Sequence, residues 1–272
     1  MRAADVRTLT ALLLALTMTA AHAQDATRPD CGAPAEFTRL DEPLFRVAYR
    51  LSRNEGLTIL AFGSSSTAGY GASTADKTYP ARLEVELRRL LPGVPIRVIN
   101  RGVGGEDVEE MLLRLQQDVI AEQPDLVLWQ VGTNALLRLQ GIDQEAPLIR
   151  EGLRRLRVAG ADTLLIDPQY APKVLRDPDA KPMVDLLASI ANDAGAPLFR
   201  RFAIMQHWHE ARKIPFETFL SSDLFHMNDW SYGCMAQNLA SAIVQTVQPP
   251  QLVAVEPPPR TVSTVAASPS NR

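Results

Sequence analysis

The sequence predicts an α/β domain of three layers, in which helices cover both faces of a parallel sheet of about five strands. Short apolar runs alternate with helical patterns along residues 57–247, and this alternation favours a doubly wound sheet. The runs are apolar nearly throughout, as expected for parallel strands that are buried on both faces. The 272 residues, of which 46% are hydrophobic and 22% charged, have the composition of an ordinary globular domain.

Each predicted element follows from a local pattern. The predicted strands are the apolar runs at residues 57–62, 96–100, 126–131 and 163–166 and a short run at 197–199. Amphipathic spacing predicts helices over residues 83–91, 108–119, 148–156 and 183–190, and a last one from Trp230 to about Val247. Ligands of such sheets bind at the carboxyl ends of the strands, so we expect the site in the loops after the first three strands.

The two ends of the chain differ from this pattern. Two arginines in the first seven residues precede an apolar stretch over residues 9–20, and an A-x-A pattern follows at residues 21–23. These features predict a signal peptide over residues 1–23, because the apolar stretch is shorter than the ~20 residues that span a bilayer. We therefore expect a secreted or periplasmic protein with no stable membrane insertion after cleavage. Residues 24–248 form the predicted domain, and residues 249–272 a disordered Pro-rich tail.

Charge and cysteine content narrow the partners. The net charge is −3, whereas a nucleic-acid binder needs a basic excess, so we expect a small molecule or a glycan as the partner instead.

Cys31 and Cys234 favour a disulfide between the N-terminal segment and the last helix, because an exported chain meets an oxidising compartment. Two buried free thiols are the alternative. No Cys/His cluster with metal-ligand spacing is present, so the sequence implies neither a metal nor an organic cofactor.

Three polar, glycine-containing loops follow the first three predicted strands. Gly63-Ser64-Ser65 follows the first, residues 100–105 (Asn-Arg-Gly-Val-Gly-Gly) follow the second, and Gly132-Thr133-Asn134 follows the third. A dinucleotide loop is not expected at residues 100–105, because the G-x-G-x-x-G spacing is not met and two acidic residues follow. Near the C-terminus, Asp223 and His226 are three residues apart, and a carboxylate there can orient an imidazole.

These four blocks together resemble the SGNH/GDSL hydrolase family, over residues 57–245 and in the family's order. The blocks are Gly63-Ser64-Ser65, Asn100 to Gly105, Gly132 to Ala135, and Asp223 to His226. The resemblance implies the SGNH hydrolase fold, with a flavodoxin-like sheet. It also implies Ser65 as nucleophile, with Asp223 and His226 as its activating pair. The implied oxyanion hole consists of the Ser65 and Gly105 N–H groups and the Asn134 amide.

Two positions depart from the family pattern. The Asp of the first block is Ser64 here, and the Asp of the third block is Ala135. Neither position has one of the roles just named, so the departures concern the hydrogen bonding of the pocket and the substrate class. Serine also flanks Ser65 on both sides, as Ser64 and Ser66, and only the register of the motif selects Ser65.

Two other kinds of site, a zinc site and an α/β-hydrolase elbow, fit the sequence less well. His207 and His209 form an H-x-H pair that could bind zinc on a strand, but their neighbours favour a helix or loop with a structural role. The elbow of an α/β-hydrolase, G-x-S-x-G, is not met because residue 67 is Thr. The predicted function is hydrolysis of carboxylic esters with short acyl chains, or of O-acetylated glycans, through an acyl-enzyme. An O-acyltransferase that uses the same triad, and a non-catalytic glycan-binding module, remain alternatives.

Overall fold

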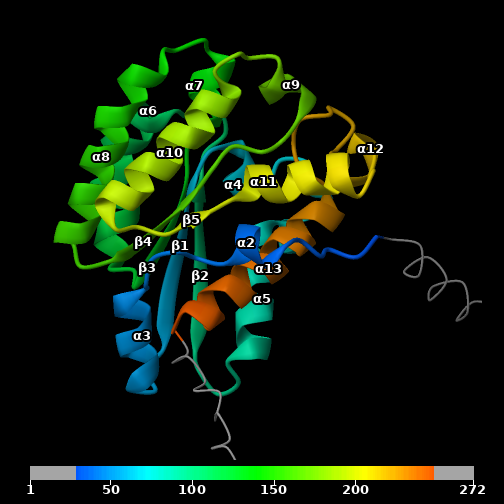
Figure 1. Cartoon of the computed structure of the whole chain (residues 1–272). Coiled ribbons are helices and arrows are strands. Elements are labelled where there is room, and N and C mark those ends of the chain that lie inside the picture. The colour runs from blue at the N-terminus through cyan, green and yellow to red at the C-terminus, as the bar shows by residue number, and fades with distance from the viewer. Residues whose placement is uncertain (1–28, 248–272) are drawn as a thin grey trace, which may run out of the picture.

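The computed structural model describes residues 29–247, so the predicted signal peptide and the predicted Pro-rich tail lie outside the described residues. Five parallel strands form one sheet in the order β2-β1-β3-β4-β5 (Figure 1). The strands are β1 (Leu57–Gly63), β2 (Ile96–Gly102), β3 (Leu126–Gln130), β4 (Asp162–Ile166) and β5 (Leu198–Phe199). The five-stranded parallel sheet predicted from the sequence is therefore confirmed.

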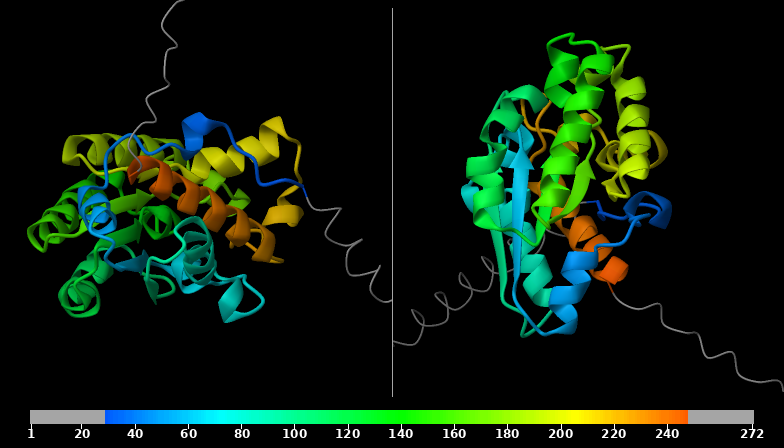
Figure 2. Two further views of the ribbon diagram at one scale, coloured as in Figure 1. Left: turned by 90° about the horizontal axis from the view of Figure 1, so that it is seen from below. Right: turned by 90° about the vertical axis from the view of Figure 1, so that its left-hand side faces the viewer.

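Helices lie on both faces of this sheet, which confirms the three layers (Figures 1 and 2). One face carries α6 (Val108–Arg114), α8 (Ile142–Val158) and α10 (Ala180–Ala194), and the other carries α5 (Tyr79–Leu90) and α13 (Asp229–Val247). The shorter elements are α2 (Ala35–Thr38), α3 (Phe45–Ser52), α4 (Ser65–Ala68), η2 (Ala75–Lys77), η3 (Leu115–Val119), η4 (Ile120–Glu122), α7 (Thr133–Leu137), α9 (Pro172–Leu175), α11 (Arg201–Gln206), η5 (His207–Ala211) and α12 (Phe216–Phe219).

Burial along the strands explains their composition. All five residues of β3 are buried, because this strand lies in the middle of the sheet with helices on both faces. β2 lies at an edge of the sheet and is less completely buried, since Arg97 and Asn100 are exposed while Ile96 and Ile99 are buried. The apolar run of the sequence thus marks a strand that is covered on both sides.

The boundaries differ from the prediction at a few positions. β2 continues past its predicted end at Asn100, because Arg101 and Gly102 pair with the last residues of β1. β3 ends one residue before Val131. The helix predicted over residues 108–119 is regular only to Arg114 and then continues as the π-helical turn η3. α3, which the sequence pattern did not predict, lies on the amino ends of the strands, where Asp162 accepts a hydrogen bond from Val47 N at 3.0 Å.

A disulfide joins the beginning of the described chain to its last helix. Cys31 and Cys234 are bonded, with their Cα atoms 5.1 Å apart, so the predicted bridge is confirmed. Asn238, one turn further along α13, also donates to the Cys31 carbonyl oxygen at 3.4 Å. The segment before α2 is therefore fixed against α13.

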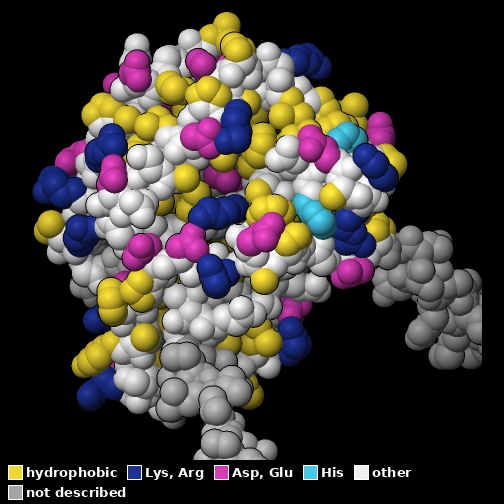
Figure 3. Space-filling view, in the orientation of Figure 1, with side chains coloured by type: hydrophobic (Ala, Val, Ile, Leu, Met, Phe, Trp, Pro, Cys, Tyr) yellow, Lys and Arg dark blue, Asp and Glu magenta, His cyan; other side chains and the backbone are white. Residues whose placement is uncertain are grey.

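The surface carries no large region of a single charge on the face shown in Figure 3, where acidic and basic side chains are interspersed. None of the helices between residues 29 and 247 combines the length and the apolar character that a bilayer span requires.

Candidate active site

The first predicted loop places a serine at the carboxyl end of β1. Ser64 precedes α4, and Ser65 is the first residue of that helix. The N–H groups of a first helical turn have no partner within the helix, so the Ser65 N–H is available to a ligand. Ser65 is 8% exposed, whereas Ser64 and Ser66 are each 1% exposed. Among the three serines, Ser65 is thus the one that is most open to solvent.

Three predicted residues come together around the Ser65 hydroxyl. Nε2 of His226 lies 2.9 Å from Ser65 Oγ, although the two residues are 161 positions apart in the chain. Nδ1 of the same ring lies 2.6 Å from Oδ2 of Asp223. Both ring nitrogens therefore have a partner. A base oriented in this way can accept the serine proton and carry the resulting charge.

Asp223 is held by more hydrogen bonds than the one to the imidazole. Its Oδ1 accepts from Ser221 Oγ at 2.6 Å and from the backbone nitrogens of Phe225 and His226, each at 3.0 Å. Partial burial alone would raise the pKa of Asp223, but these hydrogen bonds and the one from the His226 ring outweigh burial and lower that pKa well below its usual value. The carboxylate therefore stays ionised beside the imidazole.

The second block braces the turn that carries Ser65. The amide of Asn100 donates to the carbonyl oxygen of Thr67 at 2.8 Å, and its oxygen accepts from Gly102 N at 2.9 Å. A Cβ at Gly102 would lie only 2.1 Å from the backbone nitrogen of Ala68, so the two backbones are in direct contact. Gly105, at the end of the block, has a φ of 87° and so adopts the left-handed conformation that glycine allows.

The third block is joined to the second. The Asn134 side chain, which is buried, donates to the carbonyl oxygen of Glu106 at 2.7 Å. Arg138, one turn further along, donates to the carbonyl oxygen of Gly105 at 2.7 Å and forms an ion pair with Asp107. These contacts fix Gly105 and Asn134 relative to each other, at the carboxyl ends of the strands, where Ser65 also lies.

Gln130, the last residue of β3, is a site residue that the motif comparison did not include. Its Oε1 accepts from the Ser64 backbone nitrogen at 3.0 Å, from Ser64 Oγ at 3.1 Å and from Thr67 Oγ1 at 3.3 Å. Ser64, at the position where the family pattern has Asp, thus binds a neutral amide oxygen. A polar residue at the end of an otherwise apolar strand was the signal for Gln130. Ala135, the other departure, is buried in the core.

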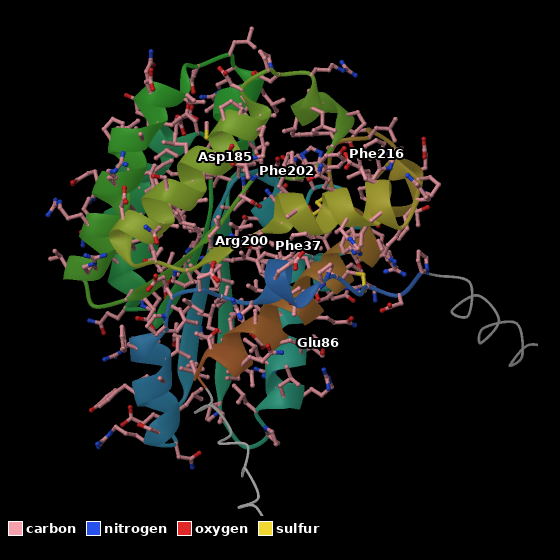
Figure 4. All side chains as sticks on the ribbon, in the orientation of Figure 1. Phe37, Glu86, Asp185, Arg200, Phe202 and Phe216 are labelled. Carbon is pink, nitrogen blue, oxygen red and sulfur yellow. A yellow bond between two sulfur atoms is a disulfide. The ribbon has the colours of Figure 1, made fainter. Side chains whose placement is uncertain are left out.

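The second histidine pair has a structural environment. His207 and His209 lie in the helical turn η5, and Nδ1 of His209 is 3.0 Å from the Ile214 carbonyl oxygen. The His209 ring also stacks on Phe216, which is labelled in Figure 4, with centroids 3.8 Å apart. The prediction of a helix or loop in place of a strand is confirmed. Within residues 29–247, no group of three or more His, Cys, Asp or Glu side chains is arranged to hold a metal ion.

Comparison with known proteins gives a family and a fold. A model of the non-GDSL lipase-like family matches residues 30–249. An acetylxylan esterase from Geobacillus stearothermophilus is 34% identical over 84 residues, which are 30% of this chain and 38% of that protein.

Solved structures with this fold include two esterases. A two-domain esterase (CEX) active on acetylated mannans superposes with a TM-score of 0.66 and 17% identity, over 83% of this chain and 60% of that one. The acetyl xylan esterase AlAXEase superposes with a TM-score of 0.60 and 20% identity, over 69% of this chain and 100% of that one. The chain thus aligns with less than two thirds of the G. stearothermophilus relative and of the two-domain esterase.

Proposed function

The chain belongs to the non-GDSL lipase-like family, and on that premise we propose that it is an exported serine esterase that removes short acyl groups, above all acetyl groups, from glycans. The resemblance to the GDSL/SGNH-type esterases that the sequence predicted is confirmed, as is their fold. The observation that carries the proposal is the contact between Ser65 and His226, whose ring also meets Asp223. The names of the similar esterases support acetylated glycans as the substrate class.

The proposed reaction begins with attack by Ser65 Oγ on the carbonyl carbon of the ester, while His226 Nε2 accepts the hydroxyl proton. The tetrahedral intermediate then collapses, and His226 returns the proton to the departing alcohol oxygen of the glycan. A water molecule attacks the acyl-enzyme in the same way, with His226 again accepting a proton. That proton returns to Ser65 Oγ when the carboxylic acid leaves. Asp223 remains ionised throughout and stabilises the charged imidazole.

We assign the negative oxygen of each intermediate to three donors: the Ser65 N–H, the Gly105 N–H and the Asn134 side chain. One hydrogen of the Asn134 amide is held by the Glu106 carbonyl oxygen, and the second is left for the substrate. Loss of one such donor typically costs roughly 3–4 kcal/mol of transition-state stabilisation.

The experiment that tests this proposal is hydrolysis of a chromogenic ester panel, from acetate to octanoate, by residues 24–272 and by Ser65→Ala. We expect turnover that is highest for acetate and that falls at least ~10³-fold in Ser65→Ala. Ser64→Ala and Ser66→Ala are the matched controls and should retain turnover. Equal turnover by the wild type and Ser65→Ala would contradict the assignment of the nucleophile.

Acetylated xylan and acetylated mannan are the polymer substrates to try next, with release of acetate as the readout. A sugar acceptor added to the same assay separates hydrolysis from acyl transfer, because a transferase leaves the acetyl group on a new hydroxyl. Binding of the polymer without any release of acetate would instead indicate a glycan-binding module and would contradict the proposed esterase.

A further inference from the structure

We propose that a pocket beside the catalytic loop, which we call the Trp230 pocket, binds an additional sugar ring of the glycan whose ester lies at Ser65. This inference rests on the proposed function. The pocket has a volume of about 360 Å³ and is lined by Gly71, Ser73, Thr218, Asn228, Asp229 and Trp230. None of these residues is part of the four sequence blocks, so the pocket is additional to the site described above.

Two chain segments lead from the catalytic residues to this pocket. Asn228 to Trp230 follow His226 after one intervening residue, and Gly71 to Ser73 come shortly after the helix that begins with Ser65. A Cβ at Gly71 would lie 3.0 Å from the Cβ of His226, so the pocket wall touches the catalytic loop itself. Because an extended chain spans at most about 3.6 Å per residue, Asp229 is within about 11 Å of His226. An oligosaccharide of a few rings can therefore occupy both places.

Trp230 gives the pocket an aromatic wall of fixed orientation. Its ring packs against Trp208, with centroids 5.0 Å apart, and its Nε1 donates to the carbonyl oxygen of Pro29 at 3.0 Å. Trp230 is partly exposed, whereas Trp129 and Trp208 are buried. A partly exposed aromatic ring can pack against the C–H face of a pyranose, and polar groups at the rim can bind the hydroxyls.

The polar rim is also held in place before any ligand arrives. Asp229 accepts from Ser73 N at 2.8 Å and from Ser73 Oγ at 2.6 Å, which ties the two segments together. The Asn228 amide donates to the carbonyl oxygens of Thr218 and Leu220 at 2.9 and 3.1 Å. A prearranged rim reduces the entropy that binding costs.

Charge distinguishes among possible ligands. Asp229 is the one ionisable side chain among the six lining residues, and Arg82 and Lys77, which lie outside the lining, help to lower its pKa, so the lining carries an ionised carboxylate and no cation that would attract a phosphate or an acidic sugar. The same carboxylate accepts hydrogen bonds from neutral hydroxyl groups. The chemistry of the lining thus favours a neutral sugar.

Tyr70, which precedes the pocket residue Gly71 in the chain, places its ring beside the catalytic histidine. Its ring is 5.5 Å from the His226 ring between centroids, and the residue is 56% exposed. Its carbonyl oxygen accepts from the Tyr232 hydroxyl at 2.7 Å, which fixes the backbone there. A glycan whose ester lies at Ser65 would therefore have this exposed ring close to the reacting group.

The test uses a variant in which a larger side chain occupies the pocket, and it compares kcat/KM for a glycan ester with kcat/KM for a small ester. Thr218→Arg places a larger, cationic side chain at a residue that lines the pocket, while the backbone carbonyl of residue 218 still accepts from Asn228. We expect the ratio of kcat/KM for acetylated xylo-oligosaccharides to that for 4-nitrophenyl acetate to fall at least tenfold. Gln237→Arg, an exposed position on α13, adds the same charge and should leave this ratio within twofold of the wild type. An unchanged ratio in Thr218→Arg would overturn the inference.

Direct binding gives a second readout that needs no turnover. With Ser65→Ala protein, unacetylated xylohexaose or mannopentaose should change the tryptophan fluorescence, because Trp230 is the partly exposed tryptophan of the three. The change should disappear in Ser65→Ala/Thr218→Arg and persist in Ser65→Ala/Gln237→Arg. No change with either oligosaccharide would also overturn the inference. If wild-type protein hydrolyses no chromogenic ester, the proposed function fails, and this titration still decides whether the pocket binds a sugar.

Discussion

The side-chain oxygen of Gln130 lies 3.0 Å from the backbone nitrogen of Ser64, the residue that precedes the proposed nucleophile. Through this contact β3, the central strand of the sheet, holds the turn that follows the neighbouring strand β1. The same oxygen also accepts from Ser64 Oγ and Thr67 Oγ1, so a single neutral acceptor serves three buried donors.

Gln130→Leu should therefore lower both stability and activity. Leucine has a similar volume but no acceptor, and it would leave the buried donors of Ser64 unpaired, at about 1–3 kcal/mol for each such group, whereas Thr67 Oγ1 keeps the Tyr79 hydroxyl as a partner. We expect the free energy of unfolding, measured in urea, to fall by at least that amount, and the kcat for chromogenic acetate to fall with it. Gln117→Leu, at an exposed position, is the control. Identical behaviour of the two variants would show that the turn does not depend on Gln130.

The environment of Asp223 predicts a pH dependence of stability. Since its pKa is lower in the folded protein than in the unfolded chain, ionised Asp223 stabilises the fold at every pH above the unfolded value of about 3.9. This contribution is lost as the pH falls through the lower, folded pKa. The difference in unfolding free energy between wild type and Asp223→Asn should thus be constant above about pH 5 and narrow below pH 4.

The same variant tests catalysis at neutral pH. Asp223→Asn should lower kcat roughly 10²- to 10⁴-fold, because an amide can no longer hold the imidazole in the productive tautomer. Asp185→Asn is a suitable control, since Asp185 is exposed and its pairing with Lys181 is of the kind that contributes little. For the stability measurement above, a difference in unfolding free energy between wild type and Asp223→Asn that is the same at pH 3 as at pH 7 would argue against a lowered pKa of Asp223.

Glu145 predicts a pH dependence of the opposite sign. This residue lies in the first turn of α8 and is 3% exposed. Burial and the nearby charge of Asp107 raise the pKa of Glu145 to about 7. A carboxyl group whose pKa is raised by folding destabilises the fold progressively as the pH rises from its unfolded value of about 4.3 to the folded one.

The wild type should therefore lose up to about 3 kcal/mol of unfolding free energy between pH 4.5 and pH 8 through this group, and Glu145→Gln should not. Urea titrations at pH 4.5, 6 and 8 measure the difference. Glu217→Gln, at an exposed position on α12, should follow the wild type at each pH. Parallel curves for wild type and Glu145→Gln would mean that Glu145 is not protonated in the folded protein at neutral pH.

The disulfide predicts a large effect on stability. Cys31 and Cys234 are separated by 203 positions, and the chain-entropy model assigns about 5 kcal/mol to a loop of that size, with measured values often smaller. Cys31→Ala/Cys234→Ala should lower the free energy of unfolding by about 2–5 kcal/mol. Addition of dithiothreitol should lower the Tm of the wild type but leave that of the double variant unchanged. In dithiothreitol, the wild type and the double variant should therefore have the same Tm.

Most of the fold was predictable because its signals are local. Each strand is a short apolar run, and β3 shows why, since it is buried along its whole length. α3 was not predicted because Val47 is its one buried residue and because its position depends on contacts with distant strand ends, such as the hydrogen bond that Val47 N donates to Asp162. A contact that spans 115 positions leaves no periodic pattern in the sequence.

The residues of the site also fall into two groups, those that the sequence motifs identified and those that they did not. The motif register located Ser65, Asp223 and His226, which the structure brings into contact. Gln130 and Ser221 act through hydrogen bonds to other site residues, and neither belongs to a motif block. The one signal for Gln130 was a polar residue at the end of an apolar strand, and that signal does not show which groups the side chain would meet. The roles assigned to Gly105 and Asn134 stay predictions until an ester or an analogue of its tetrahedral intermediate is bound.

The distance along the chain between Ser65 and His226 has a consequence for synthesis. The serine emerges from a ribosome early, whereas the histidine follows 161 residues later and is itself followed by α13, which packs against α5. A truncated or unfinished chain would carry the hydroxyl without the base, and hence no esterase activity. On our assignment, enzymatic activity requires the segment that carries Asp223 and His226, so ester turnover can serve as a simple assay for chains that extend through this segment and have folded.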